Sequence, residues 1–62
     1  MSTYTVNFKL DEDGKWVASV LEVPGCVTQG SDIDEARDRV REALALFITD
    51  ASKAILVDDF SF

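Results

Sequence analysis

The 62 residues are enough for one small domain, which we expect to cover residues 1–62. Hydrophobic residues make up 47% and charged residues 29%, which is typical of a globular chain and excludes a disordered one. Histidine is absent and Cys26 is the single cysteine, so the sequence excludes an internal disulfide and histidine-based catalysis. Without an apolar run of membrane length or the pattern of a secretion signal, we expect a cytoplasmic protein with no cofactor or metal.

The charge balance is strongly acidic, with twelve acidic residues against six basic ones and a net charge of −6. A surface of this sign repels the phosphate backbone, so we expect no direct binding of nucleic acid. The same surface attracts a basic protein partner. An alternative that the composition leaves open is that the charge only keeps a small protein soluble.

Apolar and polar residues alternate over residues 3–10, a pattern that is typical of a strand with one buried face. The apolar set consists of Tyr4, Val6, Phe8 and Leu10. Residues 12–14 indicate a three-residue turn, because Gly14 adopts positive φ without a steric clash. This turn sets Asp11 opposite Lys15, and the hairpin then pairs Leu10 with Trp16, Phe8 with Ala18 and Val6 with Val20. Trp16 is therefore expected in the core, and Val17 and Leu21 on the outer face of the sheet.

Pro24 and Gly25 end the second strand, and residues 26–29 predict a short third strand closed by Gly30 as a turn residue. Cys26 has no histidine to activate it and is best interpreted as a small buried hydrophobic residue.

A helix is predicted after Asp32, which is a suitable N-cap with Glu35 three residues later. Its apolar stripe contains Ile33, Ala36, Val40, Ala43, Leu44 and Phe47, which we expect to be buried, and Leu46 points outward. No glycine or proline marks its end, which we place near Asp50, although Ala51, Ala54 and Ile55 would continue the stripe. A fourth strand is expected within residues 55–62.

Several short motifs, taken in order, resemble the HicB-like antitoxin family over residues 4–47. They are Tyr-Thr-Val at 4–6, Asp-Glu-Asp-Gly at 11–14, Trp-Val-Ala-Ser-Val at 16–20, Val-Pro-Gly-Cys-Val-Thr-Gln-Gly at 23–30, Asp-Glu-Ala at 34–36 and Glu-Ala-Leu at 42–44. The resemblance implies an α+β fold of the reduced RNase H-like type, β-β-β-α-β with sheet order 3-2-1-4. Three strands are then antiparallel, the fourth is parallel to the first, and one helix packs on the sheet, in agreement with the order of elements above.

The resemblance also implies a function, namely that the chain binds a HicA-type toxin, a small basic ribonuclease that cleaves mRNA, and covers its active site. Many family members carry a C-terminal DNA-binding module, which we do not expect in this chain. The alternative is a solitary HicB-like domain that associates with itself and has no toxin partner.

We expect a binding protein and not an enzyme, because the first strand has no carboxylate at its centre of the kind that an RNase H site needs. The candidate partner-binding residues are acidic: Asp34, Glu35, Asp38 and Glu42 on the helix, and Asp11, Glu12 and Asp13 in the turn. The candidate self-association residues are apolar: Leu46, Phe60 and Phe62. The pair Asp58-Asp59 lacks the surrounding oxygen ligands of a calcium site.

Overall fold

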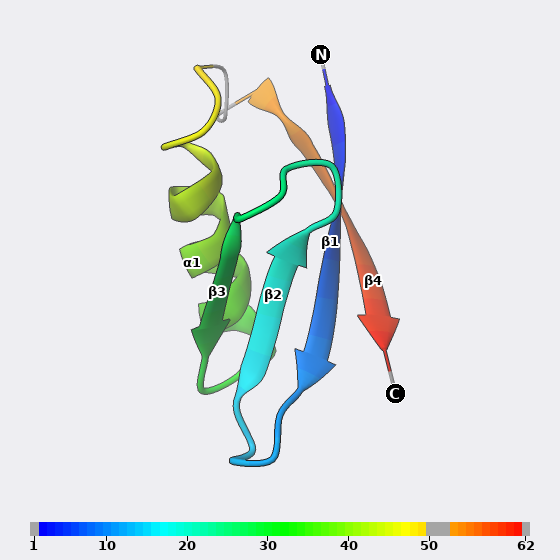
Figure 1. Cartoon of the computed structure of the whole chain (residues 1–62), viewed down its shortest axis with the longest axis vertical. Helices are drawn as coiled ribbons and strands as arrows, with labels where there is room; N and C mark the ends of the chain where they lie inside the picture. The colour runs from blue at the N-terminus through cyan, green and yellow to red at the C-terminus, as the bar shows by residue number, and fades with distance from the viewer. Residues whose placement is uncertain (1, 50–52, 62) are drawn as a thin grey trace.

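The computed structural model describes residues 2–49 and 53–61, and within them it contains a four-stranded sheet with one helix packed on one face (Figure 1). In chain order the elements are β1 (Thr3–Leu10), β2 (Trp16–Val20), β3 (Val27–Gly30), α1 (Ile33–Leu44) and β4 (Ile55–Ser61). The sheet order is β3-β2-β1-β4, with β4 parallel to β1 and the other pairs antiparallel. The predicted α+β fold and its strand order are confirmed.

The register of the first hairpin is the predicted one. Leu10 pairs with Trp16, Phe8 with Ala18 and Val6 with Val20. The turn is closed by two main-chain hydrogen bonds, from Asp11 N–H to the Lys15 oxygen and from Gly14 N–H to the Asp11 oxygen, and Gly14 has φ of +80°. A slip of one residue would move every apolar side chain to the opposite face, so the turn and the alternation of residues enforce the same register.

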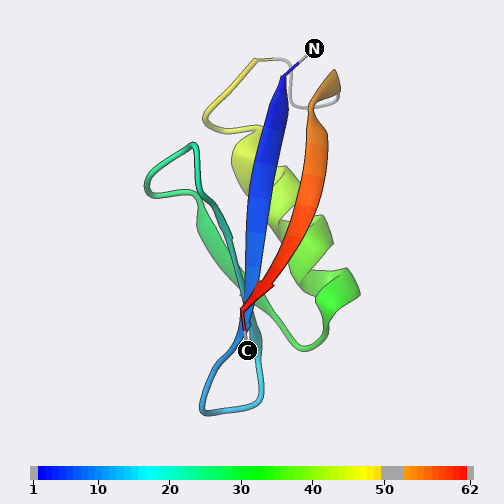
Figure 2. The same ribbon diagram turned by 90° about the vertical axis from the view of Figure 1, so that its right-hand side faces the viewer.

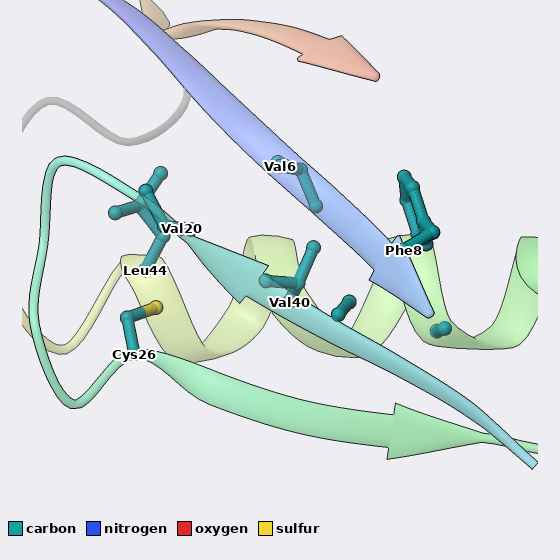
Figure 3. Close-up of a cluster of buried hydrophobic side chains, with 8 residues drawn as sticks. Val6, Phe8, Val20, Cys26, Val40 and Leu44 are labelled. Atoms are coloured by element: carbon teal, nitrogen blue, oxygen red, sulfur yellow. The ribbon is translucent and has the colours of Figure 1, made fainter. Parts of the chain in front are cut away.

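The core lies between α1 and the inner face of the sheet, where α1 packs over β3 and β2 (Figures 1 and 3). Its buried members come from all of β1, β2, α1 and the loop before β3: Val6, Phe8, Ala18, Val20, Cys26, Ala36, Val40 and Leu44. Fully burying an aliphatic or aromatic side chain of this size stabilises a fold by about 1.5–3 kcal/mol. The predicted buried role of Cys26 is confirmed.

The end of the helix differs from the prediction. Helix α1 ends at Leu44, six residues before the predicted position, and the following turn is tightened by hydrogen bonds from Leu46 N–H to Ala43 O and from Phe47 N–H to Leu44 O. Because this turn is tighter than an α-helix, Ile48 packs against the core and Phe47 is 51% exposed. The expectation that Phe47 is buried was therefore wrong, and Leu46 points outward as predicted.

Two apolar positions of the hairpin are less buried than the alternation predicted. Leu10 is 52% exposed and Trp16 is only half-buried, because this row of the sheet lies at its end, beside the start of α1. The predicted outer-face positions of Val17 and Leu21 are confirmed by the pairing of Lys9 with Val17 and by the exposure of Leu21.

Strand β3 begins one residue later than predicted. Asp50, Ala51 and Phe62, which also entered the predictions, lie outside the described residues.

Gly30 has a packing role that the sequence did not indicate. It is the buried last residue of β3, and a Cβ atom built on it would lie 2.5 Å from the main-chain nitrogen of Ala36 and 2.9 Å from the carbonyl carbon of Glu35. The first turn of α1 therefore crosses β3 at a distance that only glycine permits. The interpretation of Gly30 as a turn residue was wrong.

Candidate functional site

The start of α1 uses two of its acidic residues for its own structure. Asp32 accepts a hydrogen bond from Glu35 N–H at 2.8 Å, and the Glu35 carboxylate accepts one from Ser31 N–H at 3.0 Å. This reciprocal capping satisfies main-chain donors that the helix leaves without partners. Glu35 also lies 3.6 Å from the Arg39 guanidinium. The predicted capping residues are thus confirmed, and Glu35 has bonds within the chain that a partner would have to share.

A row of acidic side chains runs along the solvent face of α1. Asp34, Asp38 and Glu42 are each four residues apart and exposed, so they follow one line about 12 Å long at the helical rise of 1.5 Å per residue. The Asp34 side chain is 94% exposed and lies 3.4 Å from Arg37. In residues 2–49 and 53–61, no ion pair joins Asp38 or Glu42 to another residue. We refer to these three residues as the acidic row.

The acidic row is not the only charge on this helix. Arg39 and Arg41 are exposed next to it, so the helix surface as a whole is of mixed sign. The Arg37 side chain instead reaches the sheet, where it forms an ion pair with Asp58 of β4. Its guanidinium lies 5.6 Å from the centre of the Phe8 ring. A partner that selects the acidic row would therefore approach along the line of Asp38 and Glu42.

The hairpin turn holds the other predicted acidic residues, in two different roles. The Asp11 carboxylate accepts hydrogen bonds from the N–H groups of Asp13 and Lys15, both at 2.9 Å, and so fixes the turn. Glu12 and Asp13 are exposed at its tip. The carboxylates of Glu12 and Asp13 are therefore presented to solvent, and the Asp11 carboxylate is held in the turn.

The tip of the hairpin and the first turn of α1 lie toward the same end of the molecule (Figures 1 and 2). The structure thus gathers Glu12, Asp13 and Asp34 toward one end of a domain whose longest extent is 33 Å. The acidic row continues from there along the helix to Glu42. The predicted partner-binding residues form an elongated acidic surface and not one compact cluster.

The predicted self-association residues are not brought together. Leu46 is 87% exposed just after α1, whereas Phe60 lies near the end of β4, at the opposite end of the molecule (Figure 1). Phe60 is part of an aromatic cluster, since its ring stacks on Phe8 with centroids 5.3 Å apart and meets the edge of Trp16 at 6.4 Å. Phe62 lies outside the described residues. Phe60 is therefore a packing residue that fixes β4 against β1.

Two polar interactions were missed by the sequence analysis. Glu22, in the loop after β2, accepts hydrogen bonds from the Thr5 N–H at 2.7 Å and from the Thr5 hydroxyl at 2.9 Å. Both hydrogen bonds join segments far apart in the sequence, so no local pattern could indicate them.

Among the described residues, two groups have a shifted pKa. The main-chain hydrogen bond from Thr5 lowers the pKa of Glu22, and burial raises the pKa of the Cys26 thiol.

The described residues contain no helix that is long and apolar enough to span a bilayer. Their fold defines the class of the protein: a small α+β domain whose mixed four-stranded sheet carries a helix on one face.

Comparison with known proteins identifies the family. The chain is 42% identical over 50 residues to a UPF0150 protein of Thermoplasma acidophilum, a match that covers 81% of this chain and 72% of that protein. It is 40% identical over 45 residues to a UPF0150 protein of Archaeoglobus fulgidus, with 73% of this chain and 65% of that protein covered. The chain belongs to the UPF0150 family. No family model matches the chain, and the search of the solved structures found no match to it.

Proposed function

We propose that this UPF0150 chain is a HicB-like antitoxin, a non-catalytic protein that binds a small basic mRNA-cleaving toxin of the HicA type and occludes its active site in the cytoplasm. The motif order over residues 4–47 supports the HicB-like assignment. The observation that carries the proposal is the acidic row, exposed on the solvent face of α1 in a chain of net charge −6.

The acidic row suits a basic partner for a physical reason. Carboxylates with no ion-pair partner of their own steer a positively charged protein during encounter, and they gain more on binding than carboxylates already paired. Asp38 and Glu42 meet this condition best, and Glu12 and Asp13 extend the acidic surface at the hairpin end. Asp11 and Glu35 contribute less, because their carboxylates hold the turn and the helix start.

The test compares two variants with the same change in net charge. In one variant, Asp38→Lys reverses a charge at the centre of the acidic row. In the control, Ser2→Lys and Thr3→Lys add two positive charges at exposed positions at the beginning of β1, away from that row. We expect Asp38→Lys to weaken binding of the captured basic partner about five- to tenfold at low salt and to reduce the salt dependence of binding.

The control variant should bind as the wild type does within about twofold. Equal weakening by both variants would show that only the net charge matters, and no weakening by Asp38→Lys would remove the acidic row from the interface. Thermal unfolding of each variant checks that the substitutions leave the fold intact.

A second candidate function is a solitary domain that associates with itself. It is favoured by the exposure of apolar side chains outside the acidic surface, above all Leu46 at 87%. This candidate predicts that the protein purifies with copies of itself and with no basic partner.

A further inference from the structure

The two edges of the sheet are protected to different degrees. Strand β3 has four residues, α1 packs over it, and Arg39 from the helix lines a shallow hollow with Val27, Thr28 and Gln29 at this edge. Strand β4 has seven residues and forms the opposite edge, away from α1 (Figure 1). Figure 2 views the molecule from the side of β4. A long edge without a covering helix is open to pairing with another strand.

The main chain of β4 shows which groups face this edge. Ile55 N–H donates to the Ser2 oxygen at 2.9 Å, so the odd-numbered residues of β4 direct their main-chain groups toward β1. In a parallel pair the alternate residues then direct theirs away from the sheet. Leu56 and Asp58 therefore present an N–H and a carbonyl oxygen each to the free edge.

The side chains of β4 show which kind of strand would fit. Asp58 forms an ion pair with Arg37, whereas Asp59 accepts a hydrogen bond from the neutral amide of Asn7 at 3.1 Å and keeps its charge. The other groups at this edge are uncharged: the main-chain groups of Leu56 and Asp58, and the side chains of Ile55 and Val57, each 47% exposed. The exposed aliphatic side chains fit another strand of the same pattern, provided that Asp59 does not lie opposite a second carboxylate.

We propose that β4 is a self-association strand, which pairs antiparallel with β4 of a second copy about a two-fold axis at Val57. In this register Leu56 exchanges two main-chain hydrogen bonds with Asp58 of the partner subunit, and symmetry repeats the exchange, which gives four hydrogen bonds. Val57 faces the partner's Val57, and Asp59 faces the partner's Ile55. The two sheets become one continuous sheet.

Charge disfavours the symmetric register whose two-fold axis lies at Asp58. That register would set Asp58 directly opposite the partner's Asp58, and like charges directly opposite each other are destabilising. In the proposed register every carboxylate of β4 faces an aliphatic residue. The acidic row on α1 lies over the far strands and stays exposed in both copies, so the pairing is compatible with the proposed function and does not depend on it.

Disulfide trapping tests the register directly. Residues at a non-hydrogen-bonded antiparallel pair have Cα atoms about 4.5 Å apart, which is within the range of a disulfide. We therefore expect Val57→Cys to form a covalent dimer under mild oxidation at least tenfold faster than the control Val27→Cys. Val27 is a suitable control because it is 56% exposed and belongs to the edge strand β3. The native Cys26 is fully buried and does not compete.

Equal or faster trapping by Val27→Cys would overturn the proposal and move the contact to β3. Sedimentation equilibrium supplies a second measurement that needs no cysteine. We expect the wild type to dimerise with concentration and Val57→Lys to raise the dimer dissociation constant at least tenfold, with Val27→Lys unchanged within about twofold. A wild type that stays monomeric up to about 1 mM would overturn the proposal, even if β4 binds a basic protein instead.

Discussion

Replacing Gly30 by alanine is the substitution that tests the packing of this fold most severely. The added Cβ would lie 2.5 Å from Ala36 N, 2.9 Å from the Glu35 carbonyl carbon and 3.0 Å from Ala36 Cα, and all three are main-chain atoms. A flexible side chain could move aside, but these atoms are held by the capped first turn of α1. Relief therefore requires the helix to move away from β3, which loosens the contact of Ala36 and Val40 with the sheet.

The expected loss follows from general magnitudes. Overpacking costs about 1–3 kcal/mol, and a clash with main-chain atoms that cannot rotate aside belongs at the upper end, so we expect about 3 kcal/mol. A chain of this length has a free energy of unfolding of about 3–9 kcal/mol in total. In a domain this small, 1 kcal/mol corresponds to about 4–8 °C, so Gly30→Ala should lower the Tm by about 12–24 °C.

The assay is thermal and urea unfolding, followed by circular dichroism, with Gly14→Ala as the matched control. Gly14 has φ of +80° and open space around it, so alanine there meets backbone strain without a clash and should cost about 1 kcal/mol. A Gly30→Ala variant as stable as Gly14→Ala, or more stable, would refute the close contact between β3 and α1.

Three further predictions concern single groups. Asp32→Ala removes the helix cap and should lower the free energy of unfolding by about 1 kcal/mol in urea titration; an unchanged midpoint would contradict the capping geometry. Cys26, buried and with a raised pKa, should react with a thiol reagent at pH 8 only after unfolding, and rapid labelling of the native protein would show that the core is open. Because hydrogen bonds lower the pKa of Glu22 below 4.5, its contribution to stability is complete above that pH and is lost as the pH falls through the lowered value. Glu22→Gln should therefore flatten the fall of Tm with pH on the acid side, and a variant with the wild-type pH profile would argue against the contact with Thr5.

Local patterns predicted what depends on neighbouring residues. The hairpin register followed from the alternation over residues 3–10 together with the position of Gly14, and the helix start followed from Asp32 and Glu35. The helix end was predicted wrongly, because no glycine or proline marks it and the tight turn after Leu44 is selected by packing of Ile48. Helix propensity gives no signal for the end of a helix when tertiary contacts determine where it ends.

Contacts between distant segments could not be predicted in the same way. The stacking of Phe60 on Phe8 and the ion pair of Arg37 with Asp58 both depend on the register of β4 against β1, which the sequence leaves open. The close approach at Gly30 likewise depends on the helix that crosses it. These contacts show that Phe60 and Asp58 hold β4 in place.

The candidate site was predicted as a set of acidic residues without a way to rank them. The structure ranks them by their bonds within the chain, since Asp11 and Glu35 stabilise a turn and a helix start, and Asp38 and Glu42 do not. A carboxylate that already accepts two main-chain hydrogen bonds is a poorer candidate for a partner than one without such bonds.

The most direct test of the proposed antitoxin function is an RNA cleavage assay on whatever basic protein the tagged chain captures from its native cell extract at low salt. We expect a small basic protein in near-equal amount, which cleaves mRNA when separated and stops cleaving when the wild-type chain is added back. Asp38→Lys should restore part of the cleavage, because it weakens the complex. Capture of the chain without such a protein, or a captured protein whose cleavage the wild-type chain leaves unchanged, would contradict the antitoxin function.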